Sequence, residues 1–238
     1  REALKKELIV NTYLHSHTIQ ILKNAPRMFA LIEPILKANG IPDDFKYLAV
    51  IESRLDPLVV SPAGAAGLWQ IMKGTAKELG LEVDHEVDER YHIEKSTAAD
   101  YLDKAYRKFG SWTLAAASYN AGTNMITKQM NIQQQKDYYN LLLGEETERY
   151  VFRILALKQI MNHSEMYRFK VSTLHPAEET QKIKVDTSIK NWAEFAREQG
   201  ITYKTLKRFN PWLRKNELHN PHHKTYEIKI PVKKELYR

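Results

Sequence analysis

The chain has 238 residues, of which 43% are hydrophobic and 27% are charged, a composition typical of globular proteins. This length suffices for one large domain, or for one medium and one small domain. No apolar run in the sequence approaches the ~18 residues that a membrane-spanning helix requires. The absence of cysteine excludes disulfides and thiolate metal sites and is compatible with an oxidising compartment.

The net charge of +7 is unevenly distributed along the chain. Residues 1–168 contain 21 Lys and Arg against 21 Asp and Glu, whereas residues 169–238 contain 15 against 8. This change in charge predicts two domains. The basic C-terminal region fits nucleic acid, an anionic membrane or an acidic cell-wall glycan as a partner, and it equally fits an ordinary solvated surface.

Helical periodicity dominates the first part of the chain. The apolar residues of segment 2–22 fall broadly on one side of a helix, and a second helical run covers about 26–38 with a bend at Pro34. Further helices are predicted at residues 75–79, 95–108, 112–120, 123–130 and 147–162. Because no long stretch alternates as a strand does, we expect the first domain to be mainly helical.

A short helix is predicted just after residue 42. Asp43 or Asp44 can cap it, and its apolar residues repeat at steps of three or four. Pro57 disfavours the helical conformation at Asp56, so the helix should end just after Glu52. Glu52 is therefore expected near the end of a buried helix.

The C-terminal region has a different order of elements. Residues 169–180 lose periodicity and include Pro176, which predicts a linker between a first domain at 1–168 and a second at 181–238. In the second domain we expect, in order, a strand at 182–185, helices at 189–199 and 203–209, and a strand at 226–230. The predicted fold class is α+β, mainly α, with a small strand-helix-helix-strand domain at the end.

Glu52 is a candidate general acid. A general acid needs a carboxyl group that stays protonated near neutral pH, and burial among apolar neighbours raises a carboxyl pKa. The alternative is that Glu52 faces solvent or pairs with Arg54. The acidic run EVDHEVDE at residues 82–89 is expected to be a solvated loop, and its spacing lacks the ordered oxygen ligands of a calcium loop, so no metal site is predicted.

Three motifs occur in order along the first domain. They are ESRLDPLVVSPAGAAGLWQIM at residues 52–72, ASYNAG at 117–122 and ETERYV at 146–151. Over about residues 40–165 the chain resembles the lytic transglycosylase family of the lysozyme superfamily, most closely its membrane-bound type D branch. Three ordered motifs with family-like separations are much more specific than one. The resemblance implies a lysozyme-like helical catalytic domain that needs no cofactor.

The resemblance assigns roles to individual residues of this chain. It makes Glu52 the sole catalytic acid/base. The residues it assigns to substrate binding are Ser61 near the reacting sugar, Gln70 and Asn120 as sugar-binding side chains, and Tyr119 and Tyr150 as the lining of the cleft. The chain has Ser118 where the family often has alanine, and we expect this small residue to pack between helices.

The stretch GAAGLWQIM combines a permissive backbone with large apolar side chains. Gly64 and Gly67 can adopt positive φ or let a sugar ring approach the backbone. Trp69 and the pair Ile71 and Met72 are expected to anchor the segment in the core. We therefore expect Trp69 to be a core residue and not a sugar platform.

Most glycosidases use two carboxyl groups, but only one is predicted in this site. The nearest second carboxyl group in the sequence belongs to Asp56, which we interpret as a turn residue. The resemblance implies that Glu52 protonates the oxygen between MurNAc and GlcNAc, then accepts the proton of the MurNAc C6 hydroxyl as that hydroxyl attacks C1, giving a 1,6-anhydro sugar. The alternatives are a lysozyme-like muramidase that uses water, and a non-catalytic cell-wall binding or scaffold protein.

Residues 181–232 resemble, more weakly, a LysM glycan-binding module. The segment follows the strand-helix-helix-strand pattern but lacks the glycine of the usual Gly-Asp-Thr start and carries an extra NELHNPHHKT at 216–225. It is either a glycan-binding module or a degenerate one that packs on the catalytic domain or contacts a partner. His219, His222 and His223 are expected to be exposed loop residues and not ligands.

The resemblance also implies a location and partners. It implies the periplasm or cell envelope, with peptidoglycan glycan strands as substrate and a cell-envelope protein as a further partner. No nucleic-acid recognition motif accompanies the basic charge, so no nucleic-acid partner is expected. The sequence begins at Arg1 without an apolar signal segment, and any membrane anchor is expected outside it.

Overall fold

The computed structural model describes residues 2–232 of the chain. These residues cluster into two compact units, one from residues 2–55 with 97–175 and the other from residues 56–96 with 176–232. We call them the helical unit and the mixed unit. The expected domain limits at residues 168 and 181 come from the change in charge, the loss of periodicity and Pro176, and they stay a prediction. The compact units are defined by packing.

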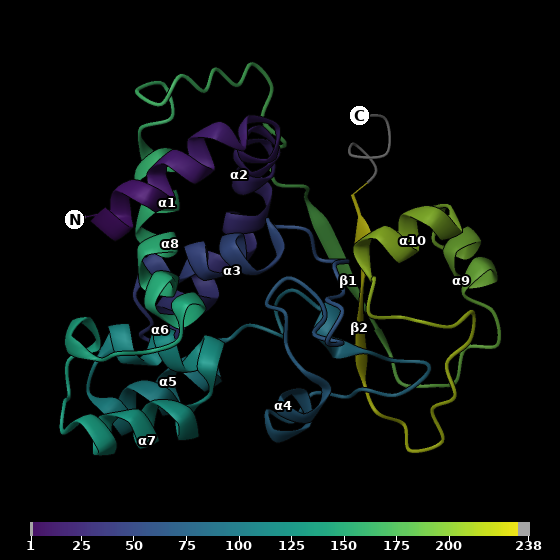
Figure 1. Ribbon diagram of the computed structural model, residues 1–238. Helices are drawn as coiled ribbons and strands as arrows, with labels where there is room; N and C mark the ends of the chain where they lie inside the picture. The colour runs from purple at the N-terminus through teal and green to yellow at the C-terminus, as the bar shows by residue number, and fades with distance from the viewer. Residues whose placement is uncertain (1, 233–238) are drawn as a thin grey trace. The chain divides into compact units, whose positions relative to one another are not determined.

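The helical unit is built around α8 (Figure 1). Its elements are α1 (Glu2–Tyr13), α2 (His15–Ala38), η1 (Asp43–Phe45), α3 (Lys46–Ser53), α5 (Ala99–Phe109), α6 (Trp112–Ala121), α7 (Thr123–Gln133), η3 (Tyr138–Asn140) and α8 (Glu145–Asn162). Helix α8 packs against α1, α3 and α6. The middle of α3 is fully buried at Leu48 and Ala49. Helix α3 is therefore an internal helix, and its C-terminal end carries Glu52.

The first helix differs from the expected segment 2–22. It ends at Tyr13, and α2 then runs without interruption to Ala38 with both Pro26 and Pro34 inside it. A proline inside a helix costs about 3 kcal/mol. The buried stripe of α2, which includes Ile32 and Leu36, is continuous past Pro34, so burial of this stripe offsets the cost.

The expected cap of α3 is wrong, but its expected end is confirmed. Asp43 and Asp44 lie in the 3-10 turn η1, and no side-chain cap bond precedes α3. Asp43 pairs instead with Lys46 at 2.6 Å and Asp44 with Lys158 at 2.7 Å. The two carboxylates therefore serve ion pairs and not the helix terminus, and α3 ends at Ser53, directly after Glu52.

The mixed unit contains a two-stranded antiparallel sheet together with short helices (Figure 1). Its elements are α4 (Lys73–Glu78), η2 (Glu89–Tyr91), β1 (Thr180–Val185), α9 (Trp192–Glu198), α10 (Tyr203–Phe209) and β2 (Tyr226–Pro231). Ile183 pairs with Ile228 in the sheet register, and α10 packs against β2 and α9. The expected strand-helix-helix-strand order and the fold class, α+β and mainly α, are confirmed.

The segment expected as a linker is partly anchored. Phe169 is 1% exposed and packs with Leu22 and Ile160 in the helical unit. The backbone N–H of His175 donates to the carbonyl of Lys23 at 2.8 Å. The aromatic side chain and this backbone hydrogen bond therefore hold the first half of the segment onto α2.

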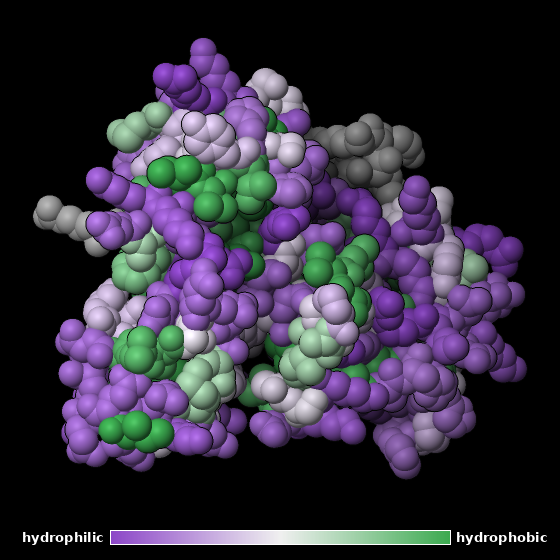
Figure 2. All heavy atoms as spheres, viewed as in Figure 1, coloured by the Kyte–Doolittle hydropathy of each residue, from purple (hydrophilic) through white to green (hydrophobic). Residues whose placement is uncertain are grey.

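The face of the molecule drawn in Figure 2 is mainly polar, with small groups of apolar side chains between the polar ones. Exposed apolar residues include Tyr13, 84% exposed, and Leu142, 76% exposed. Among the described residues, every helix is too short or too polar to cross a bilayer.

Candidate active site

Glu52 is held at the end of α3 by a tyrosine from α8. The Tyr150 hydroxyl donates a hydrogen bond to Oε1 of Glu52 at 2.5 Å. Tyr150 is 1% exposed, and burial followed by the negative charge of Glu52 raises the pKa of its hydroxyl well above the usual value. Tyr150 therefore remains a proton donor and fixes the position of the Glu52 carboxyl group.

The backbone directly after Glu52 is left-handed at two successive residues. Arg54 has φ 56° and Leu55 has φ 62°, a conformation that costs a non-glycine residue roughly 1–2 kcal/mol. Leu55 is 1% exposed, so burial of its side chain stabilises this sharp reversal. The reversal ends α3 and leaves Glu52 in its last turn.

The environment of Glu52 raises its pKa above the ordinary 4.5. Burial is the largest cause, and the nearby charge of Glu146 acts in the same direction. The hydrogen bond from Tyr150 and the positive charge of Arg153 lower the pKa but do not cancel the effect of burial. A carboxyl group in this environment holds its proton to higher pH, as a general acid requires.

The raised pKa of Glu52 predicts a pH-dependent cost in stability. A group whose pKa is higher in the folded than in the unfolded state contributes stability at low pH, and loses it as pH rises through the folded value. Glu52→Gln does not titrate, so its free energy of unfolding should exceed that of the parent increasingly above the ordinary pKa of 4.5. Urea unfolding between about pH 4 and pH 8 measures the difference. An equal difference at all pH values, or the same trend in the exposed Glu165→Gln control, would contradict this cause.

Helix α6 places Tyr119 in the electrostatic environment of Glu52. Burial, then the charge of Glu52, raises the pKa of Tyr119 well above its usual value. The Tyr119 ring packs edge-on against Tyr101 with centroids 5.2 Å apart. The helical unit thus brings Tyr119, Tyr150 and Glu52 together from three helices.

Two further side chains of α6, those of Asn120 and Ser118, form hydrogen bonds with groups other than Glu52. Asn120 accepts a hydrogen bond through Oδ1 from the hydroxyl of Thr147 at 2.8 Å. Ser118 is fully buried and donates to the carbonyl of Ala115 at 2.8 Å, so the expectation that it packs inside the helical bundle is confirmed. Thr147 is a site neighbour that the sequence motifs did not single out.

The glycine loop, residues 59–71 of the mixed unit, carries Ser61 and Gln70. Ser61 Oγ accepts from the backbone N–H of Ala65 at 3.0 Å. Gln70 has φ 49°, and its Nε2 donates to the carbonyls of Val59 at 3.0 Å and Gly67 at 2.9 Å. Both side chains therefore brace the loop on which they lie.

The apolar side chains beside the glycine loop are not all buried. Trp69 is fully buried, which confirms it as a core residue, and Ile71 is 3% exposed. Met72 is 45% exposed, so its expected role as a core anchor is wrong. The helix α4 begins at the next residue, Lys73, and Met72 is its N-cap, outside the bridged part of the loop.

The two loop glycines are required for different reasons. Gly67 has φ 80°, and a Cβ there would lie 1.9 Å from the carbonyl oxygen of Arg90. Gly64 has φ 86°, and a Cβ there would have no heavy atom within 4 Å. The absence of a side chain at Gly67 thus makes room for the backbone of Arg90, and not for a sugar ring.

Gly67→Ala should destabilise the protein far more than Gly64→Ala. Left-handed strain costs roughly 1–2 kcal/mol at each site, and the contact with Arg90 should bring the loss for Gly67→Ala to about 2–4 kcal/mol. Urea unfolding followed by tryptophan fluorescence measures both variants. Equal losses would show that the contact between Gly67 and Arg90 does not constrain the loop.

Asp56 is a turn residue, as predicted. Its Oδ1 accepts from the backbone N–H of Leu58 at 2.9 Å, and the residue is exposed. This Asx turn begins the mixed unit. Its carboxylate thus has a local structural role.

The expectation that the acidic run 82–89 is solvated is wrong for part of it. Asp88 is 7% exposed and pairs with Arg90 at 2.7 Å, and Glu89 is 3% exposed and pairs with Lys95 at 2.7 Å. Burial opposes the ionisation of Glu89, but hydrogen bonds from Lys95 and from the backbone of Glu82 outweigh it and lower its pKa. The basic partners compensate the buried charges.

The predicted site residues divide between the two units. Glu52, Tyr119, Asn120 and Tyr150 belong to the helical unit, and Ser61 and Gln70 belong to the mixed unit. Sequence reasoning missed Arg153, which lowers the pKa of Glu52 and donates to the carbonyl of Ile51 at 3.3 Å. Arg153 lies three residues after Tyr150 in α8, and this spacing places both side chains on one helix face. The spacing could therefore have indicated that Arg153 lies near Glu52.

Two family models match the chain. The model described as "Transglycosylase SLT domain" matches residues 30–142, and the model described as "Soluble lytic transglycosylase C-terminal LysM-like domain" matches residues 181–234. The first match contains Glu52, Ser61, Gln70, Tyr119 and Asn120. Tyr150 lies beyond it.

Curated proteins and solved structures give similar matches. Membrane-bound lytic murein transglycosylase D of Escherichia coli strain K12 is 30% identical over 217 residues, which cover 88% of this chain and 47% of that protein. Peptidoglycan transglycosylase gp16 of Escherichia phage T7 is 33% identical over 140 residues, covering 56% of this chain and 10% of that protein. The crystal structure of the 70 kDa soluble lytic transglycosylase SLT70 from Escherichia coli matches with a TM-score of 0.47 and 25% identity, covering 57% of this chain and 24% of that chain.

The chain spans about half the length of the type D relative that it matches. Both family models fall in the order that the motifs predicted, with the SLT match over the Glu52 region and the LysM-like match over the strand-helix-helix-strand segment. The chain thus carries a transglycosylase SLT domain at residues 30–142, followed by a soluble lytic transglycosylase C-terminal LysM-like domain at residues 181–234.

Proposed function

We propose that this chain is a peptidoglycan lytic transglycosylase, which cleaves the β-1,4 bond between MurNAc and GlcNAc without water and leaves 1,6-anhydro-MurNAc ends. The observation that carries the proposal is the Glu52 carboxyl group, which lies inside the SLT match with a raised pKa and a 2.5 Å hydrogen bond from Tyr150. Such a carboxyl group is suited to donate a proton and take one back.

Glu52 serves as both acid and base in the proposed reaction. The protonated carboxyl group gives its proton to the glycosidic oxygen as the bond from that oxygen to C1 of MurNAc breaks. The C6 hydroxyl oxygen of the same MurNAc bonds to C1, and its proton passes to the Glu52 carboxylate. Atoms and charge balance, and Glu52 returns to its protonated form.

The C6 hydroxyl replaces an external nucleophile. Holding a nucleophile within the reacting molecule can supply roughly 7–11 kcal/mol of the barrier, so no second carboxylate is needed to activate water. The turn role of Asp56 supports a single-carboxylate site, since its Oδ1 already accepts the backbone N–H of Leu58.

The remaining predicted residues bind and orient the glycan in this proposal. Tyr150 holds Glu52 in place through its hydroxyl. Tyr119 lines the cleft beside Glu52. Asn120, Ser61 and Gln70 offer amide and hydroxyl groups to the sugars, with Ser61 and Gln70 set on the braced glycine loop. The proposed location is the bacterial periplasm or cell envelope, where the substrate occurs; the name of the Escherichia coli relative describes that protein as membrane-bound.

Product analysis tests the proposed reaction. The protein is incubated with purified peptidoglycan, and the soluble muropeptides are analysed by mass spectrometry. Anhydro ends, each lighter by one water than a reducing end, are the expected product. Reducing ends would establish a muramidase instead, and the absence of any released fragment would favour a non-catalytic cell-wall binding protein.

A further inference from the structure

The C-terminal segment 176–232 shares one hydrophobic core with the segment that carries the glycine loop. Ala66, Val87 and Tyr91 of the loop segment lie in the same buried cluster as Trp192 and Trp212 of the C-terminal segment. Ala66 is itself part of the glycine loop and is fully buried. The C-terminal segment therefore provides part of the core under the loop.

Backbone contacts join the same two segments. Val87 and Leu213 form an antiparallel bridge. The N–H of Asp88 donates to the carbonyl of Trp212 at 2.9 Å, and the N–H of Arg214 donates to the carbonyl of Glu86 at 2.7 Å. The C-terminal segment thus pairs with residues 86–88 as a neighbouring strand would.

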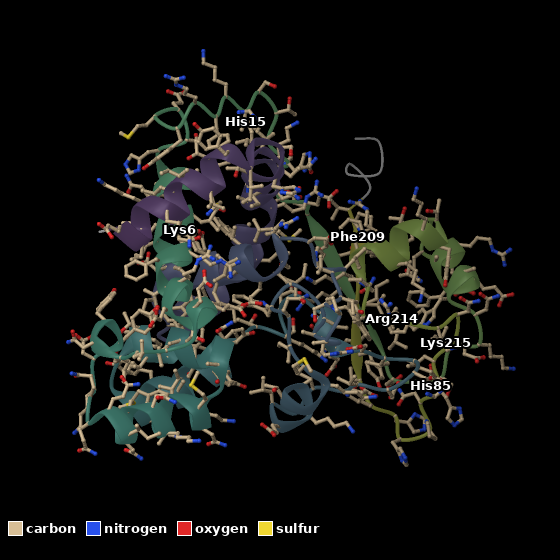
Figure 3. The ribbon with its side chains drawn as sticks, in the orientation of Figure 1. Lys6, His15, His85, Phe209, Arg214 and Lys215 are labelled. Carbon is tan, nitrogen blue, oxygen red and sulfur yellow. The ribbon has the colours of Figure 1, made fainter. Side chains whose placement is uncertain are left out.

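Side chains reinforce this pairing. The Arg214 guanidinium lies 4.2 Å from the centroid of the Tyr91 ring, and Figure 3 labels Arg214 and Lys215 in the same part of the mixed unit as His85. The Tyr226 hydroxyl donates to Glu82, with both carboxylate oxygens 3.0 Å away. Lys229 pairs with Glu94.

Arg90 continues these contacts into the glycine loop. Its guanidinium binds Asp88 through Nε at 2.9 Å and Nη2 at 2.7 Å, and its Nη1 donates to the carbonyl of Gly64 at 2.9 Å. Its own carbonyl oxygen occupies the space beside Gly67. A path of direct contacts therefore runs from the C-terminal segment through residues 86–91 to the loop that holds Ser61 and Gln70.

From this path we propose that the C-terminal LysM-like segment is a positioning scaffold for the glycine loop. Through residues 82–91 it holds Ser61 and Gln70 in place for the glycan. The role of the loop in glycan binding rests on the proposed function, whereas the packing of the C-terminal segment against the loop is observed independently of it. If the segment is such a scaffold, cleavage requires it even when the glycan fragment is too short to reach a separate binding module.

Two substitutions weaken the scaffold without touching the loop. Tyr226→Phe removes the hydrogen bond to Glu82 and keeps the ring, and Arg214→Ala removes the contact with Tyr91. Lys190→Ala, at an exposed lysine of the same segment, is the matched control. Thermal unfolding of all three variant proteins first establishes that they are folded.

Hydrogen exchange tests the scaffold independently of activity. The amides of Ala65, Gly67 and Gln70 are hydrogen-bonded within the loop. In Tyr226→Phe and Arg214→Ala we expect these amides to exchange at least several-fold faster, with α3 and α8 unchanged. Loop exchange equal to that of Lys190→Ala would overturn the positioning role, whatever the activity.

Kinetics on two substrates separate positioning from glycan capture. On a soluble peptidoglycan tetrasaccharide, both variants should lose roughly tenfold in kcat/KM, mostly through KM, because the displaced loop holds Ser61 and Gln70 less well for binding the glycan. The basic limb of the kcat/KM profile against pH, which we assign to titration of Glu52, should stay at the same pH because α3 and α8 are untouched. Parent-like cleavage of the tetrasaccharide with reduced cleavage of intact sacculi would instead identify a glycan-capturing module. Failure of the parent to cleave either substrate would refute the proposed function, while the exchange result would still decide the scaffold.

Discussion

Glu52→Gln is expected to reduce the release of anhydro-muropeptides by roughly 10²–10⁴-fold, the range that general acid-base catalysis contributes. Glutamine has nearly the shape of glutamate and can still accept the hydrogen bond from Tyr150, so the local packing should persist. It carries no exchangeable carboxyl proton, so it cannot protonate the glycosidic oxygen. Mass spectrometry of the soluble products over a time course measures the loss.

Asp56→Asn is the matched control for this substitution. Asparagine Oδ1 can accept the same hydrogen bond from the backbone N–H of Leu58, so the turn should be kept. A single-carboxylate mechanism predicts activity close to that of the parent. A loss comparable to that of Glu52→Gln would refute this mechanism and favour a two-carboxylate hydrolase.

Tyr150→Phe is expected to have the second largest effect, a loss of roughly 10- to 100-fold in kcat, because a hydrogen bond to a charged group is worth about 1.5–3 kcal/mol. The hydroxyl of Tyr150 both fixes the Glu52 carboxyl group and lowers its pKa. Without it, the pKa of Glu52 should rise further above its ordinary value, and the basic limb of the kcat/KM profile should move to higher pH.

A pH-rate profile distinguishes this role from general destabilisation. Rates of the variant and the parent are measured across the basic limb on the same soluble fragment, with Tyr139→Phe, at a tyrosine that is 55% exposed, as the control. A loss of rate with an unmoved limb would mean that Tyr150 supports packing only. A limb displaced to lower pH would contradict the sign of its effect on Glu52.

Local patterns were enough to predict several features of this protein. The apolar periodicity and Pro57 predicted that a buried helix ends just after Glu52, and α3 does end at Ser53. Turn chemistry predicted the role of Asp56. Three ordered motifs predicted the family that the SLT and LysM-like models match. Helix periodicity, turn propensity and motif spacing are properties of residues close together in the chain, so a single sequence contains them.

Other features depended on contacts between distant residues. Tyr150 lies 98 residues after Glu52, and only the packing of α8 against α3 gives that carboxyl group its hydrogen bond. The raised pKa of Glu52 comes mainly from burial, which outweighs the lowering effect of that hydrogen bond.

Asp88 and Glu89 were expected to be solvated because their burial is not visible in the sequence, although their ion-pair partners Arg90 and Lys95 are close to them in the chain. Residues 86–88 pair with the C-terminal segment, for example through the hydrogen bond from the Asp88 N–H to the carbonyl of Trp212. The sequence by itself determined the resemblance to the SLT and LysM-like domains, the strand-helix-helix-strand order of the C-terminal segment and the candidate acid. Only the tertiary structure decided what surrounds that acid and that residues 56–96 pack with the C-terminal segment, because burial and pairing depend on which distant segments fold against each other.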